Sequence, residues 1–142
     1  MTRLRPLLAA AILLAALHPA LARADGALAI GLPADVASDG VAFGWAVRLP
    51  RADAERVAVE QCRGVPGVSE DTRALCRVVR AFADSCVAVA LDPEDGTPGF
   101  GWAVAPTKSD AEAQAMGDCR RSAGETRQSF CAISVSDCDV GR

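Results

Sequence analysis

Histidine, lysine and tyrosine are almost absent from this 142-residue chain, which contains one His (His18), one Lys (Lys108) and no Tyr. Ser-His-Asp and Cys-His catalysis both require a histidine beside the nucleophile. A Ser-Lys dyad would have to use Lys108, but a repeat within the chain, described below, has Arg51 at the equivalent position. A surface charge at the start of a helix explains both cations, so the sequence favours a protein that is not an enzyme.

Long apolar runs are also missing, apart from one near the N-terminus. Leu7–Leu17 is an eleven-residue run of Leu, Ala and Ile that follows two arginines and precedes the small-residue site Ala22–Ala24. As a helix it would span about 16 Å, roughly half of a bilayer core. The order of these features predicts a cleavable signal peptide over residues 1–24, cut between Ala24 and Asp25. It predicts a periplasmic or secreted protein with no membrane insertion after cleavage.

Basic residues become a minority once this signal is removed. The chain has 15 Lys and Arg and 18 Asp and Glu residues; the signal contains three of the basic residues and none of the acidic ones, so residues 25–142 have a formal net charge of −6. This charge disfavours binding to nucleic acid or to anionic lipid heads. Arg73, Arg77 and Arg80 are a local basic cluster, for which a solvated face is the simpler explanation.

Cysteine is well represented, and all six cysteines follow the signal peptide. An even number of cysteines in an exported chain predicts three disulfides. No pair has the C-x-x-C spacing of zinc sites, and no His follows His18, so we expect no metal site and no cofactor. The cysteines are Cys62, Cys76, Cys86, Cys119, Cys131 and Cys138.

An internal repeat organises the chain after the signal peptide. Residues 43–62 align without gaps on residues 100–119, and ten of the 20 positions are identical, including F-G-W-A-V and D-A-E. Similarity continues on both sides, so we divide residues 25–142 into two repeats, about 26–84 and 85–138. Each repeat is too small for a good core of its own, so we expect one domain.

Hydrophobic periodicity changes in the same order within each repeat. Alternating and Val-rich runs predict strands, whereas a 3.6-residue period after Pro50 and after Thr107 predicts helices. The fold class we expect is α+β, with two pseudo-symmetric β-β-α-β repeats and mainly antiparallel sheet. The three-residue link 83–85 predicts that Phe82 and Cys86 are antiparallel neighbours. The expected strands are 27–32, 43–47, 76–82, 86–91, 100–105 and 131–136, and the second helix is 108–121.

The repeat also suggests how the cysteines pair. If the two units match, Cys62–Cys76 and Cys119–Cys131 are equivalent bridges from a helix end to a third strand, which leaves Cys86 to pair with Cys138. In the loop-entropy model, a bridge that closes a loop of roughly 15 residues stabilises a protein by about 3 kcal/mol.

The twofold pattern of these motifs resembles a known family. It consists of F-G-W on a strand, D-A-E in a helix that ends in Cys, and a third strand beginning Cys76-Arg77-Val78-Val79. The resemblance is to a bacterial exported family catalogued as domain of unknown function 4189, and it covers about Gly26–Cys138. It supports export, the repeat and the cysteine pairing. The family has no agreed activity, so it implies no catalytic residue, and Ala132-Ile133 departs mildly from the Val-Val of the first repeat.

The repeated aromatic residues Phe43, Trp45, Phe100 and Trp102 are the candidate binding face. They fall on matching strands and on matching faces. One interpretation is a core shared by the two repeats. The other is an exposed aromatic face for a sugar ring, a peptide or a partner protein.

Carboxylates are the remaining candidates for catalysis. Four of them lie in the first turns of the two helices, where a negative charge offsets the helix dipole. Three more lie in a turn that lacks the ligand spacing of a calcium loop. The first group is Asp53, Glu55, Asp110 and Glu112, and the second is Asp92, Glu94 and Asp95.

Our first functional hypothesis is an extracytoplasmic binding protein that blocks another envelope or secreted protein, as an inhibitor or immunity protein does. A stapled scaffold and an acidic surface suited to a basic cleft favour it. The alternatives are a carboxylate-dependent glycan hydrolase, which needs two acids about 5–10 Å apart, and a binder of glycans or small ligands that uses the Trp face.

Overall fold

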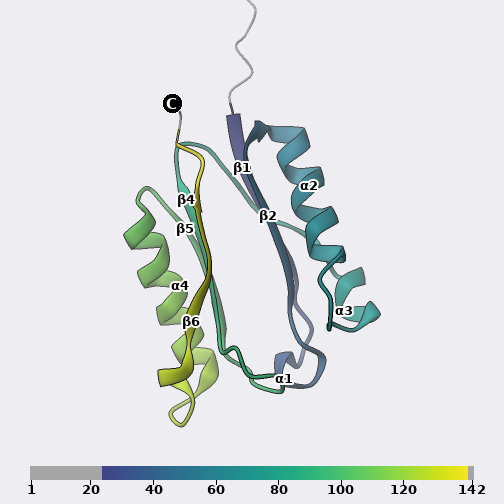
Figure 1. The fold of residues 1–142 in the computed structure, drawn as a ribbon, viewed down its shortest axis with the longest axis vertical. Helices are drawn as coiled ribbons and strands as arrows, with labels where there is room; N and C mark the ends of the chain where they lie inside the picture. Colours follow the sequence, from purple (N-terminus) through teal and green to yellow (C-terminus); the bar gives the residue numbers. More distant parts are fainter. Residues whose placement is uncertain (1–23, 141–142) are drawn as a thin grey trace, which may run out of the picture.

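The computed structural model describes residues 24–140. The predicted signal peptide lies outside the described residues except for Ala24, where the first strand begins. Figure 1 shows the chain as two helix-covered sheets that face each other. In chain order the elements are β1 (Ala24–Gly31), α1 (Val36–Asp39), β2 (Ala42–Pro50), α2 (Arg51–Arg63), α3 (Glu70–Ala74), β3 (Arg77–Phe82), β4 (Cys86–Leu91), β5 (Phe100–Ala105), α4 (Lys108–Ala123), a 3-10 helix (Gln128–Phe130) and β6 (Ala132–Cys138).

Each repeat forms its own three-stranded antiparallel sheet. The strand orders are β2-β1-β3 and β5-β4-β6, so the first strand of each repeat is central. Helix α2 covers the outer face of the first sheet and α4 that of the second, which gives four layers (Figure 1). The α+β class and the two β-β-α-β repeats are therefore confirmed. Within residues 24–140, no helix combines the length and apolarity needed to cross a membrane.

Small residues bring each helix close to its sheet. The buried side of α2 consists of Ala54, Ala58 and Cys62, and that of α4 of the equivalent alanines, Cys119 and Ala123. At the strand below, a Cβ on Gly44 would collide with the helix backbone, and the same holds for Gly101. The helix–sheet layers are thus thin, and their buried residues are alanine, glycine and cysteine, with larger apolar side chains only partly buried beside them.

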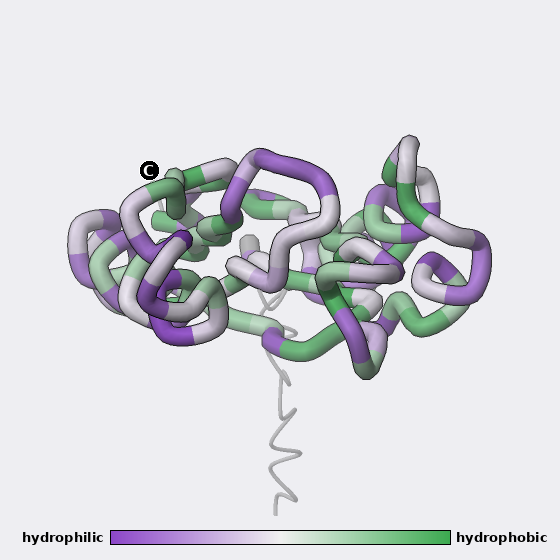
Figure 2. The backbone as a smooth tube through the Cα atoms, turned by 90° about the horizontal axis from the view of Figure 1, so that it is seen from below, coloured by the Kyte–Doolittle hydropathy of each residue, from purple (hydrophilic) through white to green (hydrophobic). Residues whose placement is uncertain are grey.

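Large apolar side chains lie between the two sheets instead. Leu28, Val87 and Val89 are completely buried there, together with Phe82 and Phe100. Seen end-on, the two repeats form two halves that meet where the sheets face each other, and hydrophilic segments lie on the outer loops (Figure 2). Since burying a large apolar side chain stabilises a fold by about 1.5–3 kcal/mol, this shared layer is the main apolar core.

One expectation about strand pairing is wrong. Phe82 and Cys86 are not neighbours in one sheet, because β3 pairs with β1 while β4 lies between β5 and β6. The link between them crosses from one sheet to the other, and Asp84 has a φ of 48° at the crossing. Three residues can span the roughly 10 Å between packed sheets, so a short link does not require a hairpin.

The three disulfides are those suggested by the repeat. Cys62–Cys76 and Cys119–Cys131 each join a helix end to the segment before a third strand. Cys86–Cys138 joins directly opposed residues of β4 and β6. No free cysteine remains among residues 24–140.

Replacing Gly101 with Ala should destabilise the protein by about 1–3 kcal/mol, because the new methyl group would push α4 away from β5. Gly117→Ala is the control: its Cβ would meet only Arg121 Nη1, at 3.5 Å. This second change should raise stability by about 0.5–1 kcal/mol, as expected for alanine in a helix. Urea denaturation with intact disulfides measures both, and equal stability of Gly101→Ala and wild type would contradict the close-packing argument.

The three disulfides should differ in their contribution to stability. Cys86–Cys138 closes a 52-residue separation, against 14 and 12 for the other two. In the loop-entropy model its replacement by two serines should cost about 4 kcal/mol, and each of the others about 3 kcal/mol. Thermal unfolding of the three double-serine variants checks this order. A larger loss of stability without Cys119–Cys131 than without Cys86–Cys138 would contradict it.

Candidate functional site

The four repeated aromatic residues occupy two different environments. Phe43 and Phe100 stack across the two sheets with ring centroids 6.4 Å apart, and both belong to the shared core. Trp45 and Trp102 lie farther along β2 and β5 and are half-buried. The two phenylalanines therefore meet the expectation of a shared core, whereas the two indoles reach the margins of the sandwich.

The margin beside Trp45 is closed by the C-terminal strand. The Trp45 indole N–H donates a hydrogen bond to Asp137 Oδ2 at 3.4 Å. The backbone N–H of Arg48 donates to Asp139 Oδ1 at 2.8 Å, and Asp139 is almost fully buried. Arg48 has a left-handed φ of 60° at a bulge in β2, so this buried carboxylate holds a strained residue in place. These contacts join the first repeat to the second.

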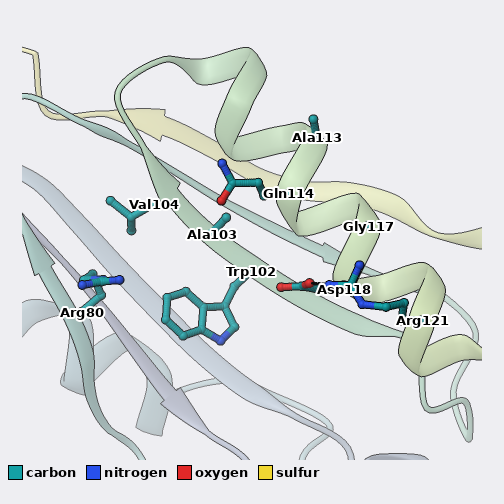
Figure 3. Close-up of a pocket in the computed structure, with 9 residues that line it drawn as sticks. All are labelled: Arg80, Trp102, Ala103, Val104, Ala113, Gln114, Gly117, Asp118 and Arg121. Carbon is teal, nitrogen blue, oxygen red and sulfur yellow. Dashed lines mark hydrogen bonds and ion pairs between the residues drawn. The ribbon is translucent and has the colours of Figure 1, made fainter.

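The margin beside Trp102 is open, and it forms a groove of about 640 Å³ between β5 and α4. Trp102 projects from β5 into this space, and Arg80 of β3 lies across from it (Figure 3). Gln114 and Asp118 extend from α4 on the other side, where Asp118 is ion-paired with Arg121. We call this space the β5 groove; its lining is Arg80, Trp102, Ala103, Val104, Ala113, Gln114, Gly117, Asp118 and Arg121.

Differences between the two repeats explain why the groove is broad on the side formed by α4. In the first repeat, Arg56 forms ion pairs with Glu60 and Asp53 on the exposed side of α2. The equivalent residues of Arg56 and Glu60 in α4 are Ala113 and Gly117, which have almost no side chain. The β5 groove is therefore broad where the first repeat has two long charged side chains.

A second cavity, of about 550 Å³, lies where α1 and residues 66–69 face the loop 91–99. It contains the three turn carboxylates predicted from sequence, of which Asp92 is buried and held by Arg127 at 2.6 Å. Arg127 also pairs with Glu94 and lies over the Phe130 ring. The hydrogen bonds from Arg127 hold the pKa of Asp92 below its usual value. A general acid needs the opposite shift, and both oxygens of Asp92 are already bound by Arg127, so the geometry gives Asp92 a structural partner and no support as an acid.

The helix-start carboxylates also have structural partners. Glu55 pairs with Arg51, and Glu112 accepts a hydrogen bond from the Ser136 hydroxyl at 2.5 Å. Asp110 lies beside its N-cap residue, Thr107, whose hydroxyl accepts from the Asp110 backbone N–H. Over residues 24–140, no cluster of three or more His, Cys, Asp or Glu side chains is arranged to hold a metal ion.

Sequence reasoning identified Trp102 but missed the other residues of the β5 groove. Arg80 was noted only as part of a basic cluster, and Gln114, Asp118 and Arg121 were not noted as candidates. The signal that could have found them is the disagreement between repeats, because Arg56 and Glu60 align with Ala113 and Gly117 inside an otherwise similar block.

Comparison with known proteins adds a family match. The family model described as Domain of unknown function (DUF4189) matches residues 26–138, which is most of the chain. No curated protein and no solved structure matches the sequence or the fold.

The Asp92–Arg127 pair should make stability depend on acid pH. Because the folded pKa of Asp92 is lowered from 3.8, the pair stabilises the fold fully above the unfolded pKa of about 3.9. This stability is lost as the pH falls through the folded pKa. Asp92→Asn should therefore be less stable than wild type at pH 6, and the gap should narrow below pH 4. Denaturant unfolding at several pH values measures the difference in unfolding free energy between Asp92→Asn and wild type. Asp95→Asn, in the same turn, is the control. A pH-independent gap would contradict the argument.

Proposed function

The chain belongs to the family described as Domain of unknown function (DUF4189), as its repeated motifs predict, and we propose that it is an exported protein that binds another envelope or secreted protein, in the manner of an inhibitor or immunity protein. The observation that carries this proposal is the β5 groove, with a half-buried indole at its centre and arginines at its borders.

The residue types of the groove fit a protein partner. Tryptophan and arginine are enriched among the residues that dominate binding energy at protein interfaces. The groove runs open along β5, whereas pockets for small ligands enclose most of the ligand surface. An open groove with Trp102 and Arg80 as anchors is therefore better suited to a polypeptide segment.

Rigidity of the scaffold supports the same function. The three disulfides tie α2, α4 and the C-terminal strand to their neighbours. A surface that is ordered before binding loses less conformational entropy when the partner arrives. The smaller entropy loss makes the complex tighter, and tighter complexes mostly dissociate more slowly. Slow dissociation suits a blocking protein, because the partner stays inhibited for as long as the complex lasts.

Export is part of the proposal. Three disulfides are typical of proteins that fold in an oxidising compartment, such as the periplasm or the extracellular space. The n-region, apolar run and small-residue site before Asp25 are those of a cleavable signal. We therefore place the working protein, residues 25–142, outside the cytoplasm.

A second candidate function is glycan binding at Trp102. The observation that favours it is the partly exposed indole beside Gln114 and Arg80, since aromatic faces and polar side chains together recognise sugar rings. Hydrolysis of a glycan in the same groove has less support, because its one carboxylate, Asp118, is ion-paired with Arg121.

Affinity capture tests the proposed function. Residues 25–142, with disulfides formed, should retain one stoichiometric protein from an envelope or secreted extract, and should lower the activity of that protein when the two are mixed. Trp102→Ala should weaken the complex by about 30-fold or more, the loss typical of a central interface tryptophan. Trp45→Ala, at the equivalent position of the other repeat, is the matched control and should bind nearly as wild type if both variants remain folded by circular dichroism.

Two results would contradict the proposal. One is retention of polysaccharide in place of protein, which would support the glycan candidate. The other is a protein partner whose affinity is equally affected by Trp45→Ala and Trp102→Ala, because the groove would then not be the contact surface.

A further inference from the structure

Strand β5 is the one edge strand of the described sheets that pairs without irregularity. The edge strands are β2, β3, β5 and β6. The pairing of β1 with β2, of β1 with β3 and of β4 with β6 each contains a register shift, whereas β4 and β5 pair continuously from Leu91↔Phe100 to Cys86↔Ala105. Bulges protect edge strands against pairing with other chains. Strand β5 lacks this protection.

The hydrogen bonds at its start show which backbone groups of β5 point outward. The Asp92 N–H donates to the Gly99 carbonyl, so Gly99 faces β4. At the next residue, both the N–H and the carbonyl of Phe100 bind Ser122 Oγ of α4, each at 2.8 Å, so they point away from β4. Antiparallel pairing alternates along a strand, so the N–H and C=O groups of Trp102 and Val104 also point away from β4, into the groove.

One of these outward groups, the Trp102 N–H, has an equivalent in the first repeat that is hydrogen-bonded. On β2 the Trp45 N–H is capped by the Gln61 side chain at 3.4 Å. The equivalent of Gln61 is Asp118, which is ion-paired with Arg121 instead. Among residues 24–140, no side chain or loop backbone forms a hydrogen bond with the main chain of Trp102 or Val104.

The groove also has an uncompensated positive charge. Arg80 has no ion-pair partner within the described residues, and the only carboxylate lining the groove is already bound to Arg121. The chain is acidic overall, but charges farther away than about 8 Å are largely screened at physiological salt. Because Asp118 offsets the charge of Arg121, a bound segment meets one uncompensated positive charge, that of Arg80.

We propose that β5 receives an extended, acidic segment of the partner protein as an added strand. The backbone of that segment pairs with Trp102 and Val104, its alternate side chains pack on the indole and over Gly117, and one carboxylate pairs with Arg80. This is strand addition to a sheet edge, in which main-chain bonds supply affinity and side-chain contacts supply specificity. The inference rests on the proposed function and names the kind of segment that the groove takes.

A second copy of the chain fits this groove less well. Two copies paired along their exposed edges would present Phe100–Ala105 to each other, a segment with no carboxylate for Arg80. The acidic partner segment is therefore the occupant favoured by charge.

The probe is a synthetic eight-residue peptide of alternating Glu and Val with blocked ends, titrated into isotope-labelled residues 25–142. We expect saturable binding, with the amide protons of Trp102 and Val104 shifted and protected from exchange. N-methylation of alternate peptide residues on the pairing edge should weaken binding about 10-fold or more, because main-chain hydrogen bonds are lost. Replacing Glu by Lys in the peptide should weaken it comparably.

Variants with matched controls locate the site. Gly117→Glu fills the groove with a negative side chain and should abolish binding, whereas Ser109→Glu adds the same charge at an exposed position of α4 outside the groove and should leave binding within about twofold. Arg80→Glu should reduce affinity about 10-fold, whereas Arg77→Glu makes the same charge change on β3 outside the groove and should have little effect. Unfolding curves of all four variants establish that each is folded.

Several outcomes would overturn the inference: no binding of the acidic peptide at millimolar concentration, equal binding of the N-methylated or Lys peptide, or amide shifts away from β5. Sedimentation of the free protein provides another, because a dimer that Gly117→Glu dissolves would make a second copy the occupant. A captured partner that still binds Gly117→Glu would refute strand addition and leave the proposed function standing. Peptide binding at β5 with no captured partner would refute the proposed function and leave strand addition at β5 standing.

Discussion

The contact between the inner faces of the two sheets is the interaction on which this fold depends. Each helix packs on its own sheet through alanines, glycines and a disulfide cysteine, and the buried members of those layers are all alanine or cysteine. Leucine, valine, isoleucine and phenylalanine are instead concentrated between the sheets, where Phe43 of one sheet stacks on Phe100 of the other. A single repeat would expose this whole layer to water, so neither repeat can bury its apolar residues without the other.

The pseudo-symmetry of the repeats ends at the margins of this core. The same F-G-W-A-V strand has opposite surroundings in its two copies. On the β2 side, Asp137 and Asp139 of the last strand bind the Trp45 indole and the Arg48 backbone. On the β5 side, the facing strand contributes Arg80, and α4 contributes small residues. A core requires equivalent packing, but the margins do not. The Trp45 indole is therefore hydrogen-bonded to the last strand, whereas the Trp102 indole lines an open groove.

The sequence alone was sufficient for most of the elements and for the cysteine pairs, because periodicity and the repeat are local or directly repeated signals. It failed where separation along the chain does not determine separation in space. The three-residue link after Phe82 can join neighbours in one sheet or strands in two facing sheets, and nothing in its residues distinguishes them. The Asp92–Arg127 pair joins residues 35 positions apart, and the approach of Arg80 to Trp102 depends on how the repeats face each other. Neither has a local pattern.

The β5 groove is held open by the same constraints that hold the fold together. Gly101 fixes the distance between β5 and α4, because its missing side chain allows contact between their backbones. Ser122 binds both main-chain groups of Phe100 and so anchors the far end of α4 to the start of β5. The Cys119–Cys131 bridge ties α4 to the segment before β6. Closing the groove would require breaking these contacts, so its opening is a fixed feature of the folded state. A segment that binds there meets a prepared edge, and the entropy lost on binding falls mainly on the segment.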